Sequence, residues 1–271
     1  MTTCSVIIST YNWPEALRLC LISLMHQSRM ADEIIICDDG SRADTQELIE
    51  EIKKDFTVPV RHVWQEDHGF QLAKIRNKGL AIASGDYIIQ IDGDLIVHRD
   101  FIKDHLNLKR PKYFTTGGRV LLSKKTTELL LTQKSISVNK FSTNNKNYFN
   151  GLHIPFLQNI LSLHYKTRGR FEYYVKGCNM AFWKDDLFNV NGYNEDFSGW
   201  GKEDSELAIR LINSGVKKQF LKFGGICYHL FHREANRNME KTNTELMMNS
   251  VRNKVTTVVN GLSKYLANTN A

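Results

Sequence analysis

Two aspartates that end a strand-like run have the type and spacing of a metal site. Residues 86–94 form an apolar, β-rich run bounded by Gly85 and Gly93, which is typical of a buried strand. In an open parallel sheet, ligands bind beyond the carboxyl ends of the strands. Asp92 and Asp94 would lie there, as hard oxygen ligands for Mg²⁺ or Mn²⁺ and, through the ion, for a diphosphate. Taken alone, such a pair is more often an Asx turn that closes the strand.

Three more clusters of acidic residues or histidines follow strand-like runs or open a helix. They are Asp38 with Asp39, Glu203 with Asp204, and His229 with His232. Because the carboxyl ends of parallel strands converge on one edge of a sheet, we expect all four clusters to face a single cleft.

The first third of the chain alternates strand-like and helix-like segments. The expected strands are 5–12, 33–37, 58–64 and 86–92, and the expected helices are 14–26, a segment around 48–52, and 72–83. Asn12 suits a helix N-cap, and Pro14 suits the first helical turn. This order predicts an α/β fold with a mostly parallel central sheet covered by helices. Neither the Gly-x-Gly-x-x-Gly fingerprint nor a Walker lysine loop is present, so a nucleotide would bind in another way.

From Pro111 onward the pattern is less regular. We expect strands at 114–122, 173–183, 220–221 and 226–229, helices at 126–131, 156–164 and 205–213, and a mobile asparagine-rich loop at 137–148. Gly177 lies inside the second of these strands, and Gly215 suits the C′ position of the third helix. A last helix over 242–266 carries one apolar stripe.

Composition limits the class of partner and the compartment. The net charge of +7 suits a polyanionic partner, but the charge is dispersed, which argues against a nucleic-acid-binding protein. Five cysteines lie mostly in apolar runs without a Cys-x-x-Cys pair, which indicates free thiols in a reducing cytoplasm. No signal peptide or membrane-spanning stretch is visible. We therefore expect a cytoplasmic protein, including the inner face of the cytoplasmic membrane.

Several motifs occur in an order that resembles a known family. In chain order they are Thr10-Tyr11-Asn12, Ile36-Cys37-Asp38-Asp39-Gly40-Ser41, Ala73-Lys74-Ile75-Arg76-Asn77-Lys78-Gly79, Gly85-Asp86-Tyr87-Ile88 and Asp92-Gly93-Asp94. These motifs resemble family 2 glycosyltransferases of the GT-A fold, which is Rossmann-like.

The second half of the chain is similar to the galactosyltransferase-type C-terminal half of β-1,4-galactosyltransferases and bacterial chondroitin-polymerase domains. Segments 177–182 and 199–204 carry this similarity, and the resemblance covers about residues 4 to 235. Lys202 departs from it, because the galactosyltransferases have a second glycine there. The resemblance implies a nucleotide-binding half (1–110) and an acceptor-binding half (111–238) in one GT-A domain (1–238), followed by a C-terminal helix (239–271).

The resemblance also implies how a UDP-sugar would bind. Tyr11 would lie against the uracil ring, with Ser9 and Thr10 nearby. Asp39, next to Asp38, would accept from uracil N3–H. The structural alternatives are packing of Tyr11 at a strand end and a capped turn at the two aspartates.

Two cations on the helix after the third strand would meet the diphosphate. Arg76 is a bidentate donor there, with Lys74 beside it. The alternative places Arg76 on a solvated helix face.

The metal site implied by the resemblance combines carboxylate and imidazole. Asp94 would be the direct ligand and Asp92 would face the ribose or a metal-bound water, with Gly93 between them. His229 and His232 align with further metal ligands of the family, although isolated histidines are more often structural. Imidazole beside carboxylate favours Mn²⁺, with Mg²⁺ as the alternative.

Transfer with inversion needs a base that takes the proton from the acceptor hydroxyl. The resemblance assigns this role to Asp204 at a helix N-terminus, where a carboxylate is stabilised. Glu203 would bond sugar hydroxyls, and Trp200 would offer an apolar platform. Gly177 would admit the donor sugar close to the backbone, and Asn179 would bond its hydroxyls. The alternative is a capping acid pair with Trp200 in the core.

These observations predict an inverting, metal-dependent glycosyltransferase. It would move a hexose or N-acetylhexosamine from a UDP-sugar to a hydroxyl of a glycan or lipid-linked glycan in surface polysaccharide synthesis. A catalytically silent UDP-sugar-binding or scaffold subunit is the alternative from another class. The mixed Asn/Lys polar face of the C-terminal helix favours packing or homodimerisation over peripheral membrane contact.

Overall fold

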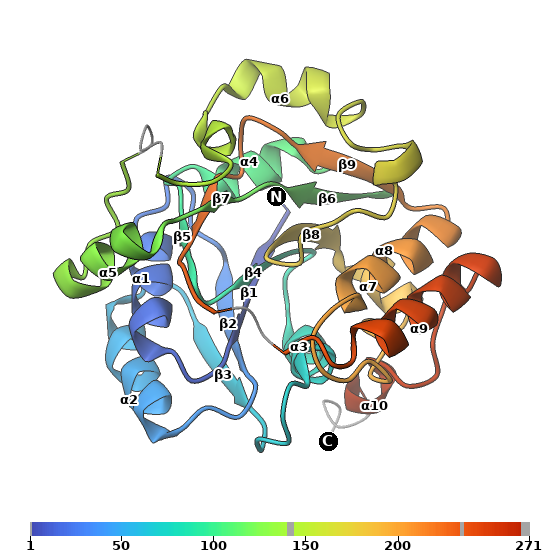
Figure 1. Ribbon diagram of the computed structural model, residues 1–271, viewed down its shortest axis with the longest axis horizontal. Coiled ribbons are helices and arrows are strands. Elements are labelled where there is room, and N and C mark those ends of the chain that lie inside the picture. The colour runs from blue at the N-terminus through green and yellow to red at the C-terminus, as the bar shows by residue number, and fades with distance from the viewer. Residues whose placement is uncertain (1, 140–143, 234–235, 267–271) are drawn as a thin grey trace.

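A seven-stranded mixed sheet forms the centre of the protein in a computed structural model that describes residues 2–139, 144–233 and 236–266 (Figure 1). Its strand order is β3-β2-β1-β4-β8-β6-β9. The strands are β1 (Cys4–Thr10), β2 (Glu33–Asp38), β3 (Val60–Trp64), β4 (Tyr87–Asp92), β6 (Tyr113–Gly117), β8 (Asn179–Trp183) and β9 (Lys217–Leu221). β1 to β4 are parallel, whereas β8 runs antiparallel to both β4 and β6. The predicted α/β architecture is confirmed.

Helices cover both faces of this sheet because alternate strand residues are apolar on both sides. Val6 and Ile8 belong to one buried cluster, with residues of α1, α2 and α4, whereas Ile7 belongs to another, with residues of α3, α7 and α8. In Figure 1, α1 and α2 accordingly lie on one side of the sheet and α7 and α8 on the other. The α-helices are α1 (Pro14–Met25), α2 (Ala43–Ile52), α3 (Leu72–Ile82), α4 (Phe101–Leu108), α5 (Lys124–Gln133), α6 (Pro155–Ser162), α7 (Lys184–Asn189), α8 (Glu203–Asn213), α9 (Glu240–Arg252) and α10 (Ser263–Leu266).

A second, three-stranded sheet was not anticipated from the sequence. Its order is β5-β10-β7, formed by β5 (Leu95–Val97), β10 (Cys227–His229) and β7 (Val120–Leu121). β10 runs antiparallel to β5, with His229 opposite Leu95. Because Leu95 directly follows Asp94, this pairing brings two distant parts of the chain together.

Several sequence-based boundaries were wrong. The expected strand 114–122 is divided into β6 and β7 by Gly118 and Arg119, and the expected strand 173–183 begins only at Asn179, so Gly177 precedes it. Asn12 is not the N-cap of α1: Trp13 holds that position, and Asn12 adopts a φ of 47°. The side chain of Asn12 instead accepts a hydrogen bond from Arg42 N.

The expected helix 126–131 and the glycine after the helix 205–213 are confirmed, whereas the expected mobile loop at 137–148 is not tested. α5 contains the expected helix 126–131, and Gly215 follows α8 with a φ of +87°. Residues 140–143 of the expected mobile loop lie outside the described residues, and mobility of the remainder stays a prediction.

The expected continuous helix over 242–266 was also wrong. α9 ends at Arg252 and α10 begins at Ser263. The intervening stretch contains a run of β-branched residues, Thr256 to Val259, which have low helix propensity.

The C-terminal segment packs on the domain. Ser250 Oγ on α9 donates to Glu206 Oε1 on α8 at 2.9 Å, and Leu262 is fully buried in the core. No helix among the described residues combines the length and apolar character needed to cross a bilayer.

Candidate active site

Arg76 on α3 is a buried cation surrounded by carboxylates. Only 1% of its side chain is exposed. Its Nη2 lies 3.0 Å from Asp92 Oδ1, its Nη1 lies 2.9 Å from Asp204 Oδ1, and its Nε donates to Ser9 Oγ at 3.0 Å. The register of β1 with β4, in which Ser9 is opposite Asp92, brings these two partners of Arg76 together at the carboxyl edge of the sheet. The hypothesis of a solvated helix face for Arg76 was therefore wrong. The expected bidentate contact with a diphosphate is not built either, because Nη1 and Nη2 are engaged by Asp204 and Asp92 inside the protein.

Asp204 is held by one carboxylate oxygen. Its Oδ1 accepts from Arg76 Nη1, from Gln90 Nε2 at 3.3 Å and from Tyr193 Oη at 2.9 Å. Within the described part of the chain, Asp204 Oδ2 makes no hydrogen bond. Asp204 thus has a fixed orientation, with Oδ1 in a hydrogen-bond network and Oδ2 beside Gly177.

Gly177 makes room for the same carboxylate. A Cβ built on Gly177 would lie 1.7 Å from Asp204 Oδ2, so any side chain there would displace Asp204. The expected role of this glycine was close approach of a donor sugar. The structure shows instead that its missing side chain admits the catalytic candidate itself.

Glu203, the first residue of α8, differs from Asp204 in its electrostatics. Its side chain is buried, and its Oε2 has no hydrogen-bond partner among the described residues. Burial and the adjacent Asp204 carboxylate raise the pKa of Glu203 well above its ordinary value, so the protonated form, which donates a hydrogen bond, is favoured. Lys202 precedes it with a φ of 78°, a left-handed conformation that costs less for the glycine found there in galactosyltransferases.

Asp94, His229 and His232 converge as the sequence predicted. Both imidazole Nε2 atoms face Asp94 Oδ2, at 3.4 Å from His229 and 3.2 Å from His232. The hydrogen bond to Asp94 raises the pKa of His232, whereas burial lowers that of His229.

The donor set of this cluster fits a divalent ion. The Nδ1 atoms of His229 and His232 lie 2.9 and 2.7 Å from the carbonyls of Leu230 and Arg233. These bonds place a proton on Nδ1 of each ring, so the neutral form of each histidine would offer its Nε2 lone pair to a metal, an arrangement typical of metal-ligating histidines. Asp94 Oδ1 is buried without a partner among the described residues.

The expected uracil-binding aspartates are both anchored inside the protein. Asp39 accepts from Gln65 Nε2 at 2.6 Å and Gln71 N at 2.9 Å, and burial raises its pKa to about 6. Asp38 is fully buried and accepts from Ser41 N, with His62 Nε2 3.1 Å away. Asp38 therefore closes the turn, as the structural alternative held.

Two aromatic candidates remain accessible. Tyr11 is 50% exposed, and its hydroxyl donates to Asp67 Oδ2 at 2.9 Å. Trp200 is half-buried, with the Arg237 guanidinium 4.9 Å from its ring centroid.

Two further residues expected to bind the nucleotide-sugar are Gly93, directly after β4, and Lys74 on α3. Gly93 lies against Thr10, whose Oγ1 would be 3.2 Å from an added Cβ. Lys74 Nζ lies 3.3 Å from Gln71 Oε1.

Asn179 has a different place from the one expected. It is fully buried, and its side-chain NH₂ donates to the carbonyls of Gly118 and Gly225, while His105 Nε2 lies 3.0 Å from its Oδ1. These bonds use the amide within the core, so the expected contact with a sugar is not built.

Sequence reasoning did not identify Gln90 and Tyr193, which both donate hydrogen bonds to Asp204 Oδ1. Gln90 could have been noticed as a polar residue inside an apolar strand, whereas Tyr193 carries no local signal.

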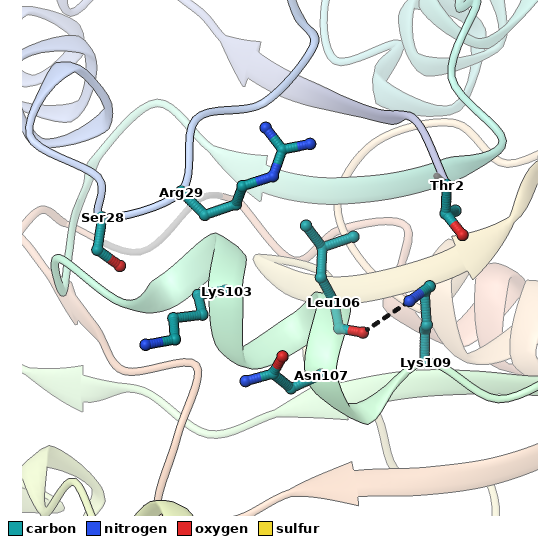
Figure 2. A pocket seen from close by; sticks show the side chains of 7 residues that line it. All are labelled: Thr2, Ser28, Arg29, Lys103, Leu106, Asn107 and Lys109. Atoms are coloured by element: carbon teal, nitrogen blue, oxygen red, sulfur yellow. Dashed lines mark hydrogen bonds between the residues drawn. The ribbon is translucent and has the colours of Figure 1, made fainter.

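A shallow cavity of about 380 Å³ lies away from this cluster. Figure 2 shows its lining, which includes Thr2, Ser28 and Lys103. Thr2 precedes β1, at the opposite edge of the sheet from Asp92, so the cavity is not part of the candidate active site.

The fold is that of a GT-A glycosyltransferase. The chain belongs to glycosyl transferase family 2, whose sequence profile matches residues 5–169. Residues 159–233 match the profile described as the N-terminal domain of galactosyltransferase.

Two bacterial polymer synthases are among its curated relatives. The chain is 30% identical to chondroitin synthase of Escherichia coli, over 83% of this chain and 34% of that protein. It is 29% identical to hyaluronan synthase of Pasteurella multocida, over 78% of this chain and 23% of that protein. The chain therefore spans about a third or less of these relatives.

Solved structures share the fold at low sequence identity. The mannosyltransferase PcManGT from Pyrobaculum calidifontis, in complex with GDP-Man and Mn²⁺, superposes with a TM-score of 0.63 at 16% identity and covers 93% of this chain and 64% of its own. TarS 1–349 of S. aureus, in complex with UDP-GlcNAc, superposes with a TM-score of 0.62 at 15% identity and covers 93% and 67%.

Proposed function

We propose that this protein is an inverting, metal-dependent glycosyltransferase that moves a hexose or N-acetylhexosamine from a UDP-sugar to a hydroxyl of a glycan acceptor. One observation carries the proposal: Arg76 contacts both Asp204 and Asp92. Two residues after Asp92, Asp94 faces His229 and His232. One edge of the sheet thus combines a candidate base with a candidate metal site.

Asp94, His229 and His232 would hold Mn²⁺, with Mg²⁺ as the alternative. When bound, the ion supplies Lewis-acid stabilisation of the departing diphosphate. Asp92 would face the ribose or a water in the ion's shell.

Asp204 Oδ2 would take the proton from the acceptor hydroxyl. Arg76, Gln90 and Tyr193 hold the other oxygen, so the base keeps its orientation during proton transfer. Protonated Glu203 would donate to a sugar hydroxyl through its unpartnered carboxyl. Trp200 would pack on a sugar face.

The donor assignment draws on the first half of the chain. The exposed Tyr11 ring would stack on uracil, and Asp39 would accept from uracil N3–H at a lone pair that Gln65 and Gln71 leave. The names of the relatives, which are chondroitin and hyaluronan synthases, support a polysaccharide product, and the complex of TarS 1–349 with UDP-GlcNAc supports a UDP-sugar donor. The acceptor would be a growing glycan, free or lipid-linked, in surface polysaccharide synthesis.

The site of action would be the cytoplasm, at the inner face of the membrane when the acceptor is lipid-linked. All five cysteines are buried and free, which is consistent with a reducing compartment.

A panel of UDP-hexoses and UDP-N-acetylhexosamines, offered with Mn²⁺ and oligosaccharide acceptors, tests this function. We expect one donor to yield product with the anomeric configuration inverted, observed by proton NMR. Retention of configuration would contradict the mechanism. UDP-sugar binding without turnover of any donor would favour the catalytically silent subunit.

A further inference from the structure

A second group of metal-ligating side chains lies outside the candidate active site. His98, Asp100 and His153 each offer one ligand atom, and these atoms all lie within 4.8 Å of one another. His98 and Asp100 follow β5, whereas His153 immediately precedes α6. Sequence reasoning did not single out any of the three, because His153 lies more than fifty residues from His98 and Asp100.

The two clusters lie at opposite ends of one ladder. β10 pairs with β5 so that His229 is opposite Leu95, and His98 N donates to Ile226 O at 2.9 Å, beyond the other end of the pairing. At about 3.3 Å per residue, the four steps from Asp94 to His98 span about 13 Å. One ion could not serve both clusters.

His153 is oriented by a buried carboxylate. Its Nε2 lies 3.0 and 3.2 Å from the two oxygens of Asp104, which is 3% exposed. Gln158 Nε2 and Gly225 N donate to Asp104 and hold it in place. A carboxylate that accepts from one imidazole nitrogen leaves the lone pair of the other for a metal, which is the usual support of a metal-ligating histidine.

The other two ligands are also positioned. Ser28 Oγ donates to Asp100 Oδ1 at 2.6 Å, and Asp100 N donates to His98 Nδ1 at 3.2 Å. An ion would therefore take His98 through Nε2, with loss of the proton that this nitrogen carries in the neutral ring. The rings of His98 and His153 are 4.7 Å apart between centroids. The three side chains are 12–20% exposed, so an ion could enter from solvent and still be largely enclosed.

We propose that His98, Asp100 and His153 form a second metal site, for a divalent transition ion of the zinc class, with water at the fourth position. Two imidazoles and one carboxylate suit Zn²⁺ better than Mg²⁺ or Ca²⁺, which prefer oxygen ligands throughout. The ion would tie the loop after β5 to the segment before α6, and α6 lies beside α4 in the fold (Figure 1). The site is structural and independent of the proposed glycosyl transfer.

Zinc stoichiometry in the metal-stripped full chain tests the proposal. Zinc retained after equilibrium dialysis is measured by mass spectrometry in an Asp94→Ala background, which removes the carboxylate of the other cluster. We expect one equivalent in Asp94→Ala and none when His153→Gln or Asp100→Asn is added. His164→Gln, at an exposed histidine, serves as the matched control and should retain the equivalent.

Asp100→Asn keeps the protein testable if His153→Gln does not fold. Asparagine retains the size of the side chain and an oxygen that can accept from Ser28; the Asp100 side chain makes no capping bond to α4 that would be lost. If Asp94→Ala binds no zinc, or if both variants bind as much zinc as it does, the proposal is wrong and the cluster is only a hydrogen-bond network. This readout needs neither UDP nor turnover, so its failure is distinct from failure of the proposed function.

Discussion

Arg76 Nη1 lies 2.9 Å from Asp204 Oδ1, across 128 residues of sequence. The same guanidinium lies 3.0 Å from Asp92, so the candidate base and the acid that ends β4 share one buried cation. This pairing positions Asp204 and also balances charge that would otherwise be costly to bury.

Replacing Arg76 should therefore destabilise the protein and remove activity together. Arg76→Ala leaves Asp92 and Asp204 without their cation, and we expect a loss of about 3–5 kcal/mol in the free energy of unfolding. Urea unfolding measures this loss. Arg18→Ala, which breaks the surface pair with Glu51, is the control and should change stability far less. Equal losses in both variants would contradict the structural role of Arg76.

Gly177→Ala should impair turnover more than donor binding. The added Cβ would collide with Asp204 Oδ2, and displacement of a catalytic group by about 1 Å can lower the rate by about 10². Steady-state kinetics and UDP titration separate the two effects. Gly151→Ala is the control, because its nearest neighbour would be 3.6 Å away. Unchanged kcat in Gly177→Ala would show that Asp204 does not act from this position.

UDP binding should depend on both the metal and Asp94. We expect Mn²⁺ to raise the UDP affinity of the wild type by about tenfold or more, a coupling of about 1.4 kcal/mol. Isothermal titration of Asp94→Ala should show no such gain, whereas Asp55→Ala, at an exposed aspartate, should behave as the wild type. Metal-independent binding in the wild type would overturn the assignment of this cluster.

His105 should make stability fall in mild acid. Burial lowers its pKa from 6.5 to about 4, despite the hydrogen bond with Asn179. Below pH 6.5 the unfolded chain therefore binds a proton that the folded protein does not, so stability decreases as the pH falls from 6.5 towards 4.

The slope for one such group is about 1.4 kcal/mol per pH unit, which gives about 2 kcal/mol between pH 6.5 and 5. Denaturant unfolding at both pH values should show this loss in the wild type and a smaller loss in His105→Gln. Identical losses would mean that other groups cause the acid sensitivity.

Local sequence was sufficient to predict the position of the site residues that lie on parallel strands. Apolar runs located β1, β2 and β4, and the convergence of their ends placed Asp38 and Asp92 at one edge. The histidine pair and Glu203-Asp204 were found through the resemblance.

Long-range packing accounts for what sequence reasoning missed. Nothing in the sequence near Arg76 or Asp204 indicates that the two side chains form an ion pair. The need for a glycine at position 177 is likewise evident only from the structure, where the Asp204 carboxylate lies against it. Asn179 lies in a matching motif, but its amide is used within the core. The short strands β5 and β10 carry too few residues for a periodic signal, although their pairing brings His229 to Asp94.

The most direct test of the account compares chemistry with binding in Asp204→Asn. Asparagine preserves the shape of the side chain but cannot accept the acceptor's proton. We predict that Mn²⁺-dependent UDP binding stays near the wild-type level, while single-turnover transfer slows by about 10²–10⁴-fold. Transfer at the wild-type rate by this variant would contradict the assignment of Asp204 as the base.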